Sequence, residues 1–335
     1  MNRKVLKNVV IAGVCMASLK AGIALGQEAT PPDQAEFARE VAAMQRQYDK
    51  MPDSIGTGPY PAIKTVDPAF PGYVVYRPKK FGTTGHHKLA VLAWGNGACS
   101  ADGASARLQL EEVASYGYLV LAPGSVQSGP GAPPRTSKPA PRPEGAPLSS
   151  DTKPAALTKA IDFAVAANAQ PGRYHNRIDT SAIAVAGHSC GGLQALAVAG
   201  DPRVKAVVIQ NSGIFPDGTT PIEGMDLGKA QLKQLHTPIL YILGGPRDIA
   251  YENGMDDFRR IDHVPAMVAN IDVGHLGTFA KPDGGAVARV VVNWLQWQLR
   301  GDSHAGASFT GPDCGLCDNP EWTVERKRMS AVDRQ

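Results

Sequence analysis

The segment that most restricts how this chain can fold is Gly187-His188-Ser189-Cys190-Gly191, which has the pattern G-x-S-x-G. The apolar run 182–186 before it is typical of a buried strand, and residues 192–198 after it are typical of the start of a helix. In this pattern the serine occupies a sharp turn, and the glycines on either side relieve the crowding that a Cβ would create. We therefore expect a strand, a tight turn carrying Ser189, and a helix.

Two later segments place an acid and a histidine directly after strand-like runs. Asp248 follows the apolar run 238–244, and His275 follows the run 267–273. The order serine, acid, histidine, each at the end of a strand, is the order of a nucleophile, its orienting acid and its base in a parallel sheet. We expect His275 to take the proton of Ser189 and Asp248 to orient the imidazole. The alternative acids on the next helical turn are Glu252, Asp256 and Asp257.

A glycine-containing turn after an earlier strand is the candidate for the second half of an oxyanion hole. The apolar run 88–94 is followed by Gly95-Asn96-Gly97-Ala98-Cys99. An oxyanion hole needs two backbone N–H groups, one of which comes from the residue after the nucleophile. We assign these amides to Asn96 and Cys190, with Gly97 as the alternative to Asn96. The competing interpretation is an ordinary glycine-rich turn.

These motifs together resemble the α/β-hydrolase family, over about residues 73–299. The resemblance is greatest to members without a cap, such as dienelactone hydrolases and the secreted polyester hydrolases related to cutinases. The resemblance rests on the segment 187–192, Asp248-Ile249-Ala250, Gly274-His275 and the amphipathic helix 286–299.

The family implies an α/β-hydrolase fold, with a mostly parallel central sheet flanked by helices, in a single domain without a large cap. It also implies catalytic residues at the carboxyl ends of the strands. Many polyester hydrolases carry an aromatic residue at the first oxyanion position and a methionine after the nucleophile. This chain has Asn96 and Cys190 there, so the resemblance does not imply activity on plastics.

The first 26 residues have the pattern of a secretory signal peptide. Basic residues precede a short apolar stretch, 9–19, and Ala24-Leu25-Gly26 offers a small-x-small cleavage site. We expect a secreted or periplasmic protein with no stable membrane insertion after cleavage. Lipidation of Cys15 is an alternative, which the bulky Val14 before it disfavours.

Four cysteines remain after that cleavage, and an oxidising compartment favours their pairing. Three pairings are possible. The hydrolase resemblance puts Cys99 on the oxyanion loop beside the turn of Cys190, and so implies the pairs Cys99–Cys190 and Cys314–Cys317. Cys314-Gly315-Leu316-Cys317 also has the form of a redox motif, but its Gly/Pro/Asp-rich surroundings favour a small structural clip. No second pair accompanies it, so we expect no metal.

Charge and motifs exclude other classes of partner. The formal net charge is +3, and removal of the signal leaves 30 basic and 31 acidic residues. This balance argues against a nucleic-acid partner. Neither a dinucleotide fingerprint nor a P-loop is present, so we expect no cofactor.

The chain divides into four parts by composition, and 43% apolar residues can bury the core of one large domain. Residues 34–50 predict an amphipathic helix, expected on the outside of the domain. The Pro/Gly-rich loop 124–150 leaves a central strand and is expected to hang over the active-site face. The parts are a signal peptide 1–26, an N-terminal helical extension 27–55, an α/β-hydrolase domain 56–300 and a C-terminal tail 301–335 with the CxxC clip.

The functional expectation is a secreted serine esterase that acts through an acyl-enzyme on small aryl or alkyl esters or polyesters. Its partner would be a small-molecule or polymeric ester substrate. One alternative is a carbohydrate esterase that removes acetyl or feruloyl groups, and an alternative of another class is a catalytically idle hydrolase-fold binding protein. The sequence does not determine the acyl group, the alcohol or the oligomeric state.

Overall fold

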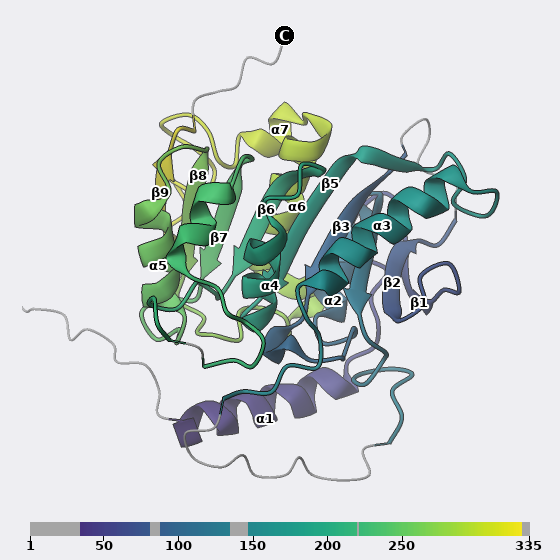
Figure 1. Ribbon diagram of the computed structural model, residues 1–335, viewed down its shortest axis with the longest axis horizontal. Helices are drawn as coiled ribbons and strands as arrows, with labels where there is room; N and C mark the ends of the chain where they lie inside the picture. Colours follow the sequence, from purple (N-terminus) through teal and green to yellow (C-terminus); the bar gives the residue numbers. More distant parts are fainter. Residues whose placement is uncertain (1–33, 81–87, 135–146, 220, 330–335) are drawn as a thin grey trace, which may run out of the picture.

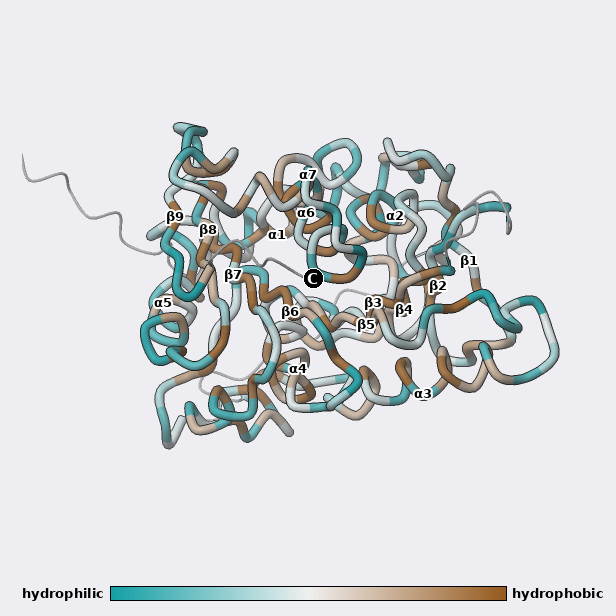
Figure 2. Tube along the Cα trace, turned by 90° about the horizontal axis from the view of Figure 1, so that it is seen from above, coloured by the Kyte–Doolittle hydropathy of each residue, from teal (hydrophilic) through white to brown (hydrophobic). Residues whose placement is uncertain are grey.

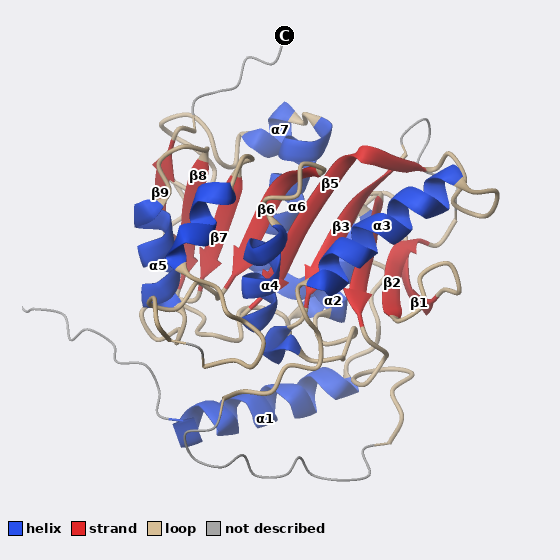
Figure 3. Ribbon diagram, in the orientation of Figure 1, coloured by secondary structure: helices blue, strands red, loops and turns tan. Residues whose placement is uncertain are grey.

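The computed structural model describes residues 34–80, 88–134, 147–219 and 221–329. Its core is one nine-stranded sheet with the order β1-β2-β4-β3-β5-β6-β7-β8-β9 (Figures 1 and 3). Neighbouring strands from β4 through β3 and β5 to β8 pair in parallel, whereas β1, β2 and β9 pair antiparallel. The strands are β1 (Ala62–Val66), β2 (Tyr73–Pro78), β3 (Leu89–Gly95), β4 (Tyr118–Pro123), β5 (Ile178–His188), β6 (Val204–Gln210), β7 (Ile239–Leu243), β8 (Ala266–Ile271) and β9 (Trp322–Lys327).

Helices cover both faces of the sheet. Figure 2 shows α3, α4 and α5 on one side and α2, α6 and α7 on the other. The α-helices are α1 (Gln34–Lys50), α2 (Arg107–Ser115), α3 (Ala155–Ala169), α4 (Cys190–Val198), α5 (Tyr251–Arg260), α6 (Gly285–Arg300) and α7 (Ser303–Gly306), and the short 3-10 helices are η1 (Gly97–Cys99), η2 (Lys229–Gln234) and η3 (Pro282–Gly284).

The central strands are continuous apolar runs because helices bury both of their faces. Every residue of β3, β4 and β7 is buried. One core lies between the sheet and α3 and α4, with Ile161 and Leu193 in it, and the other lies beneath α2 and α6, with Leu110 and Val291. The predicted α/β class with a mostly parallel sheet is confirmed, and the arrangement is compatible with an α/β-hydrolase-like fold.

Helix α1 has the predicted extent and lies on the outside of the domain, as expected. It lies across the edge of the sheet at which the parallel strands end (Figure 1). Tyr48 in its last turn is only 1% exposed, and its hydroxyl donates a hydrogen bond to the carbonyl of Ala104 (3.2 Å). The helix is therefore attached to the loops that follow the strands.

The C-terminal tail folds back onto the body. It adds β9 to the edge of the sheet beside β8, with Trp322 opposite Ile271. The boundary expected at residue 301 is thus not a structural one, since the tail completes the same sheet. Within the described residues, no helix is long and apolar enough to span a membrane. The predicted signal peptide, 1–26, lies outside the described residues.

Candidate active site

Ser189 occupies the predicted turn between β5 and α4. Its backbone is in an unusual conformation for a residue with a side chain, φ 52° and ψ −123°. Such a conformation costs of order 1–3 kcal/mol and is found where surrounding structure imposes it. A Cβ at Gly187 would lie 2.1 Å from the carbonyl oxygen of Gly191, and one at Gly191 would lie 2.0 Å from that of Gly95. The glycines of the motif are thus required by close backbone approach.

The structure brings Ser189, His275 and Asp248 into one chain of hydrogen bonds. Nδ1 of His275 lies 2.6 Å from Oδ1 of Asp248, and Nε2 of the same ring lies 2.9 Å from Oγ of Ser189. Asp248 and His275 are 1% and 7% exposed, and they occupy the loops after β7 and β8. The carboxylate accepts a hydrogen bond from the Nδ1–H group, which leaves Nε2 as the acceptor for the serine hydroxyl.

The surroundings of Asp248 favour its ionised form. Oδ2 accepts hydrogen bonds from the amide of Gly244 (3.0 Å) and from Nδ2 of Asn211 (2.9 Å), and Oδ1 accepts one from the amide of Ala250 (2.9 Å). Burial alone would raise the pKa of Asp248, but the hydrogen bond and charge of His275, with these donors, hold the pKa below its ordinary value.

None of the three alternative acids forms the hydrogen bond to Nδ1 of His275. Asp257 is buried and accepts hydrogen bonds from Lys229 (2.7 Å) and from the amide of Ile214 (2.7 Å), while Asp256 pairs with Lys229 and Arg260. Glu252 lies in the first turn of α5 and makes no hydrogen bond to His275 among the described residues.

Two further residues hold the histidine in place, and the sequence analysis did not single them out. Nδ2 of Asn211 also donates to the carbonyl of Gly274 (3.1 Å), so it joins the acid to the histidine loop. Its backbone is left-handed, φ 47°, a conformation that asparagine tolerates well. The available signal was an asparagine directly after the apolar run of β6.

The second residue that holds His275 in place is His188, which is also the second residue of the G-x-S-x-G motif. Its Nε2 donates to the backbone carbonyl of His275 (2.8 Å), and its ring contacts those of His275 and Phe279, with centroid distances of 5.2 and 4.8 Å. Burial, together with the nearby His275, lowers the pKa of His188 to about 4. The ring is therefore neutral near pH 7, and its orientation is set by one hydrogen bond.

The loop predicted to complete the oxyanion hole lies beside Ser189. Asn96 is fully buried, and its Nδ2 donates to the carbonyls of Ser100 (2.9 Å) and Pro123 (2.8 Å), so the side chain supports the loop. Gly97 and Ala98, rather than Asn96, line the pocket, which favours Gly97 for this amide. Cys190 is the first residue of α4, where a backbone N–H has no acceptor within the helix.

Both predicted cysteine pairs lie within disulfide-bonding distance. Cys99 and Cys190 have their Cα atoms 5.2 Å apart and connect η1 to the start of α4. Cys314 and Cys317, with Cα atoms 4.9 Å apart, close a short turn in the tail. The first pair thus links the two segments to which the oxyanion amides are assigned.

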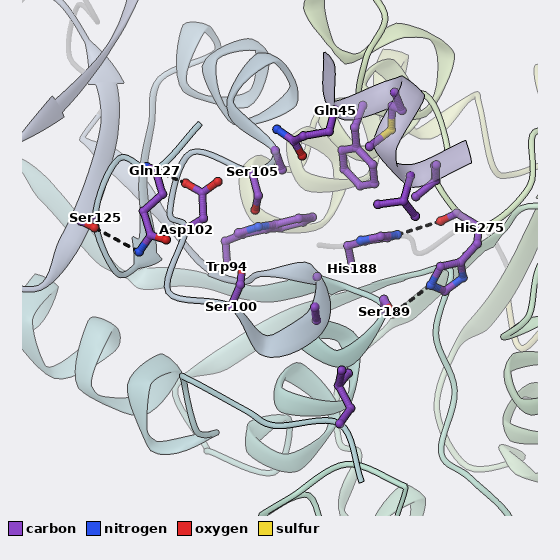
Figure 4. A pocket seen from close by; sticks show the side chains of 18 of the residues that line it. Gln45, Trp94, Ser100, Asp102, Ser105, Ser125, Gln127, His188, Ser189 and His275 are labelled. Carbon is purple, nitrogen blue, oxygen red and sulfur yellow. Dashed lines mark hydrogen bonds between the residues drawn. The ribbon is translucent and has the colours of Figure 1, made fainter. Parts of the chain in front are cut away.

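A pocket with a volume of about 930 Å³ opens over Ser189 and His275. Residues from α1 and from the described part of the loop 124–150 contribute to its wall, which agrees with the prediction for that loop; its residues 135–146 lie outside the described residues. Figure 4 shows His188, Ser189 and His275 at one end, Asp102, Ser125 and Gln127 at the other, and Trp94 between them. Among the described side chains, no group of three histidine, cysteine or acidic residues is placed to hold a metal ion.

No protein-family model matches this sequence, and a search of curated proteins detects no relative.

Proposed function

We propose that this protein is a serine hydrolase that cleaves carboxylic esters through an acyl-enzyme. One observation carries the proposal: Asp248, His275 and Ser189 form a continuous hydrogen-bond chain that ends at a partly exposed serine on a strained turn. A serine hydroxyl becomes nucleophilic when a neutral imidazole within hydrogen-bond distance takes its proton, and the buried carboxylate stabilises the imidazolium that forms. The finer family assignment, to cap-less α/β-hydrolases, rests on the same residues.

In the acylation half-reaction, Oγ of Ser189 bonds to the ester carbonyl carbon while its proton moves to Nε2 of His275. The carbon–oxygen bond to the alcohol then breaks, and Nε2 returns the proton to the leaving oxygen. In deacylation, water bonds to the acyl carbon and gives a proton to Nε2, after which the bond to Oγ breaks and the proton returns to Ser189. Each cycle consumes one ester and one water and releases an alcohol and an acid.

The negative charge of each tetrahedral intermediate would lie between the amide of Cys190 and that of Gly97 or Asn96. Preorganised N–H donors of this kind stabilise the charge by about 3–4 kcal/mol each. The pair Cys99–Cys190 supports the assignment, because it connects the two donor segments. It also supports a secreted or periplasmic location, since such pairs persist in oxidising compartments.

Labelling with an alkyl fluorophosphonate tests the proposal, with hydrolysis of 4-nitrophenyl acetate and butyrate measured in parallel. We expect an adduct on Ser189 and loss of turnover in step with labelling. Ser189→Ala should lower kcat by at least about 10⁴-fold while the protein stays folded. Ser181→Ala, a change at an exposed serine in the same strand, is the matched control. Turnover that survives in Ser189→Ala would refute the assignment.

A catalytically idle binding protein is the alternative of another class, and absence of both label and turnover would favour it. A redox role for Cys314 and Cys317 has less support, because Cys314 is fully buried, whereas an attacking thiol must be accessible.

A further inference from the structure

The pocket over Ser189 has two chemically different ends, and the end remote from Ser189 is polar. It is built from the loops after β3 and β4, which brace each other. Oδ1 of Asp102 accepts hydrogen bonds from the amides of Ala104 and Gln127, both at 3.0 Å, and Nε2 of Gln127 donates to the carbonyl of Ala101 (2.9 Å). These contacts set the positions of Asp102 and Gln127 before any substrate binds.

Several polar atoms at this end remain available. Oδ2 of Asp102, Oε1 of Gln127 and the hydroxyls of Ser100 and Ser105 have no hydrogen-bond partner among the described residues. All four side chains are partly or largely exposed in the pocket wall. The end therefore presents both acceptors and donors to a ligand, in fixed positions and close to solvent (Figure 4).

The wall near the candidate nucleophile is apolar, and α1 supplies part of it. Val41 and Met44 are half-buried on the pocket side of α1. Leu276 follows His275, and Ile249, which follows Asp248, is 47% exposed at the pocket. Large apolar side chains rarely stay so exposed on the described part of this chain, where only Ile55, Val66 and Ile249 do so. An apolar group bound here would cover them.

The position of α1 is built into the fold. Arg107 of α2 is fully buried; its Nη2 donates to the carbonyls of Tyr48 (2.6 Å) and Met51 (2.7 Å), and its guanidinium stacks 3.9 Å from the Tyr48 ring centroid. A positive group at the C-terminal end of a helix also interacts favourably with the helix dipole. The segment after α1 is held in turn by Glu112, which accepts hydrogen bonds from the amide and hydroxyl of Thr57.

We propose that the pocket binds an amphipathic ester, with an apolar arm beneath α1 and a hydroxylated arm against Asp102, Ser105 and Gln127. The inference rests on the proposed esterase function and names its substrate class. Hydroxyl groups both donate and accept, so they satisfy the carboxylate, the amide oxygen and the serine hydroxyls together. An apolar arm at that end would strip water from Asp102 without replacing its hydrogen bonds, and the site would reject it.

Three butyrate esters with a common acyl group test the inference on the purified full-length mature chain. They are the ester at the primary hydroxyl of methyl glucoside, cyclohexylmethyl butyrate, which has a similar ring without hydroxyls, and butyrylcholine, which carries a cation. We expect kcat/KM for the glucoside ester to exceed that of each other ester by about tenfold or more.

Substitutions then show which residues cause the preference for the glucoside ester. Gln127→Ala and Ser105→Ala should each raise KM for the glucoside ester by several-fold. The ratio of kcat/KM for the glucoside ester to that for the cyclohexylmethyl ester should fall by the same factor. Asp102→Asn keeps the Oδ1 acceptor that braces the loops and should also reduce the preference. Gln170→Ala and Ser181→Ala, at exposed positions outside the pocket, are the matched controls and should keep the wild-type ratio.

Equal turnover of the glucoside and cyclohexylmethyl esters would overturn the inference, and so would a preference for butyrylcholine, which would assign Asp102 to a cation. A preference that Gln127→Ala and Ser105→Ala both leave unchanged would overturn it as well. Hydrolysis of 4-nitrophenyl butyrate separates these results from failure of the proposed function. If that ester is not cleaved and Ser189 is not labelled, the esterase proposal itself is refuted, and the proposed substrate class is refuted with it.

Discussion

At the scale of single residues, the candidate site consists of the three hydrogen-bonded side chains of Asp248, His275 and Ser189 and of two residues that hold them. Asp248 and His275 lie on separate loops, and Asn211, which follows β6, and His188, at the end of β5, connect those loops to the neighbouring strands. The imidazole is therefore held through both its ring and its backbone carbonyl. Such support keeps a base within hydrogen-bond distance of a nucleophile without reorganisation during the reaction.

Replacement of Asn211 by glycine should lower kcat/KM without unfolding the protein. The change removes the hydrogen bonds to Asp248 and to the carbonyl of Gly274, while glycine keeps the left-handed backbone. Hydrogen bonds to charged groups contribute about 1.5–3 kcal/mol, so we expect a loss of about ten- to a hundredfold. Hydrolysis of 4-nitrophenyl butyrate measures it, with circular dichroism as the folding control. Activity within twofold of wild type would show that Asn211 does not position the acid.

His188 predicts a specific dependence of stability on pH. Because burial lowers its pKa to about 4, the native state binds fewer protons than the unfolded state between that pH and an ordinary histidine pKa of about 6.5. This stability is present above pH 6.5 and is lost as the pH falls toward 4.

In urea denaturation, the difference in unfolding free energy between wild type and His188→Gln should therefore shrink by about 2 kcal/mol from pH 7 to pH 4.5. Comparison with the variant cancels the titration of other groups, including Asp257, whose pKa burial raises to about 6. The same difference at both pH values would contradict this account of His188.

At the scale of elements, η1 and α4 meet beside Ser189, and Cys99 and Cys190 join them. Breaking this connection with Cys99→Ser should reduce both stability and turnover. The loop between the two cysteines spans 91 residues, so loss of the link should cost about 4 kcal/mol. A displaced oxyanion donor should lower kcat by about tenfold or more.

The matched control for that substitution is Cys314→Ser with Cys317→Ser, which removes the remote pair and should leave kcat unchanged. Thermal unfolding and 4-nitrophenyl butyrate turnover are measured on both proteins. Wild-type kcat in a folded Cys99→Ser protein would separate the link from catalysis.

At the scale of the whole molecule, the two ends of the described chain complete the body that carries the site. Helix α1 forms part of the pocket wall, and β9 covers the edge of β8. Nζ of Lys327 donates to the carbonyls of Phe258 (2.6 Å) and Ile261 (3.0 Å), at the C-terminal end of α5. The tail thus supports the strand and helix that flank the loops of Asp248 and His275.

A chain that ends at Gly311 should therefore lose stability and solubility. It exposes the edge of β8, and an unpaired edge strand invites pairing with other chains. We expect a lower unfolding temperature and soluble aggregates in size-exclusion chromatography. A chain that ends at Met329 keeps β9 and serves as the control. Equal melting temperatures and monomeric elution for both would show that β9 is dispensable.

Local sequence patterns were sufficient to predict much of the fold and the residues of the candidate triad. The strand–turn–helix at Ser189 follows from apolar runs and from glycines that no other residue can replace, and these are local requirements. Asp248 and His275 were predictable because the carboxyl ends of parallel strands share one edge, so residues that follow those strands converge. The pairing of Cys99 with Cys190 followed from the same convergence, once the hydrolase resemblance had supplied the order of the strands.

Only the tertiary structure decided what holds and covers the site. Asn211 and His188 act through hydrogen bonds to segments far along the chain, and no local pattern encodes such a partner. The position of α1 depends on Arg107 and on a pocket edge that exists only after folding. An amphipathic helix specifies that one face is buried but not the surface against which it packs. The sequence by itself thus determined which residues form the candidate triad, while long-range packing determined their support and the shape of the space above them.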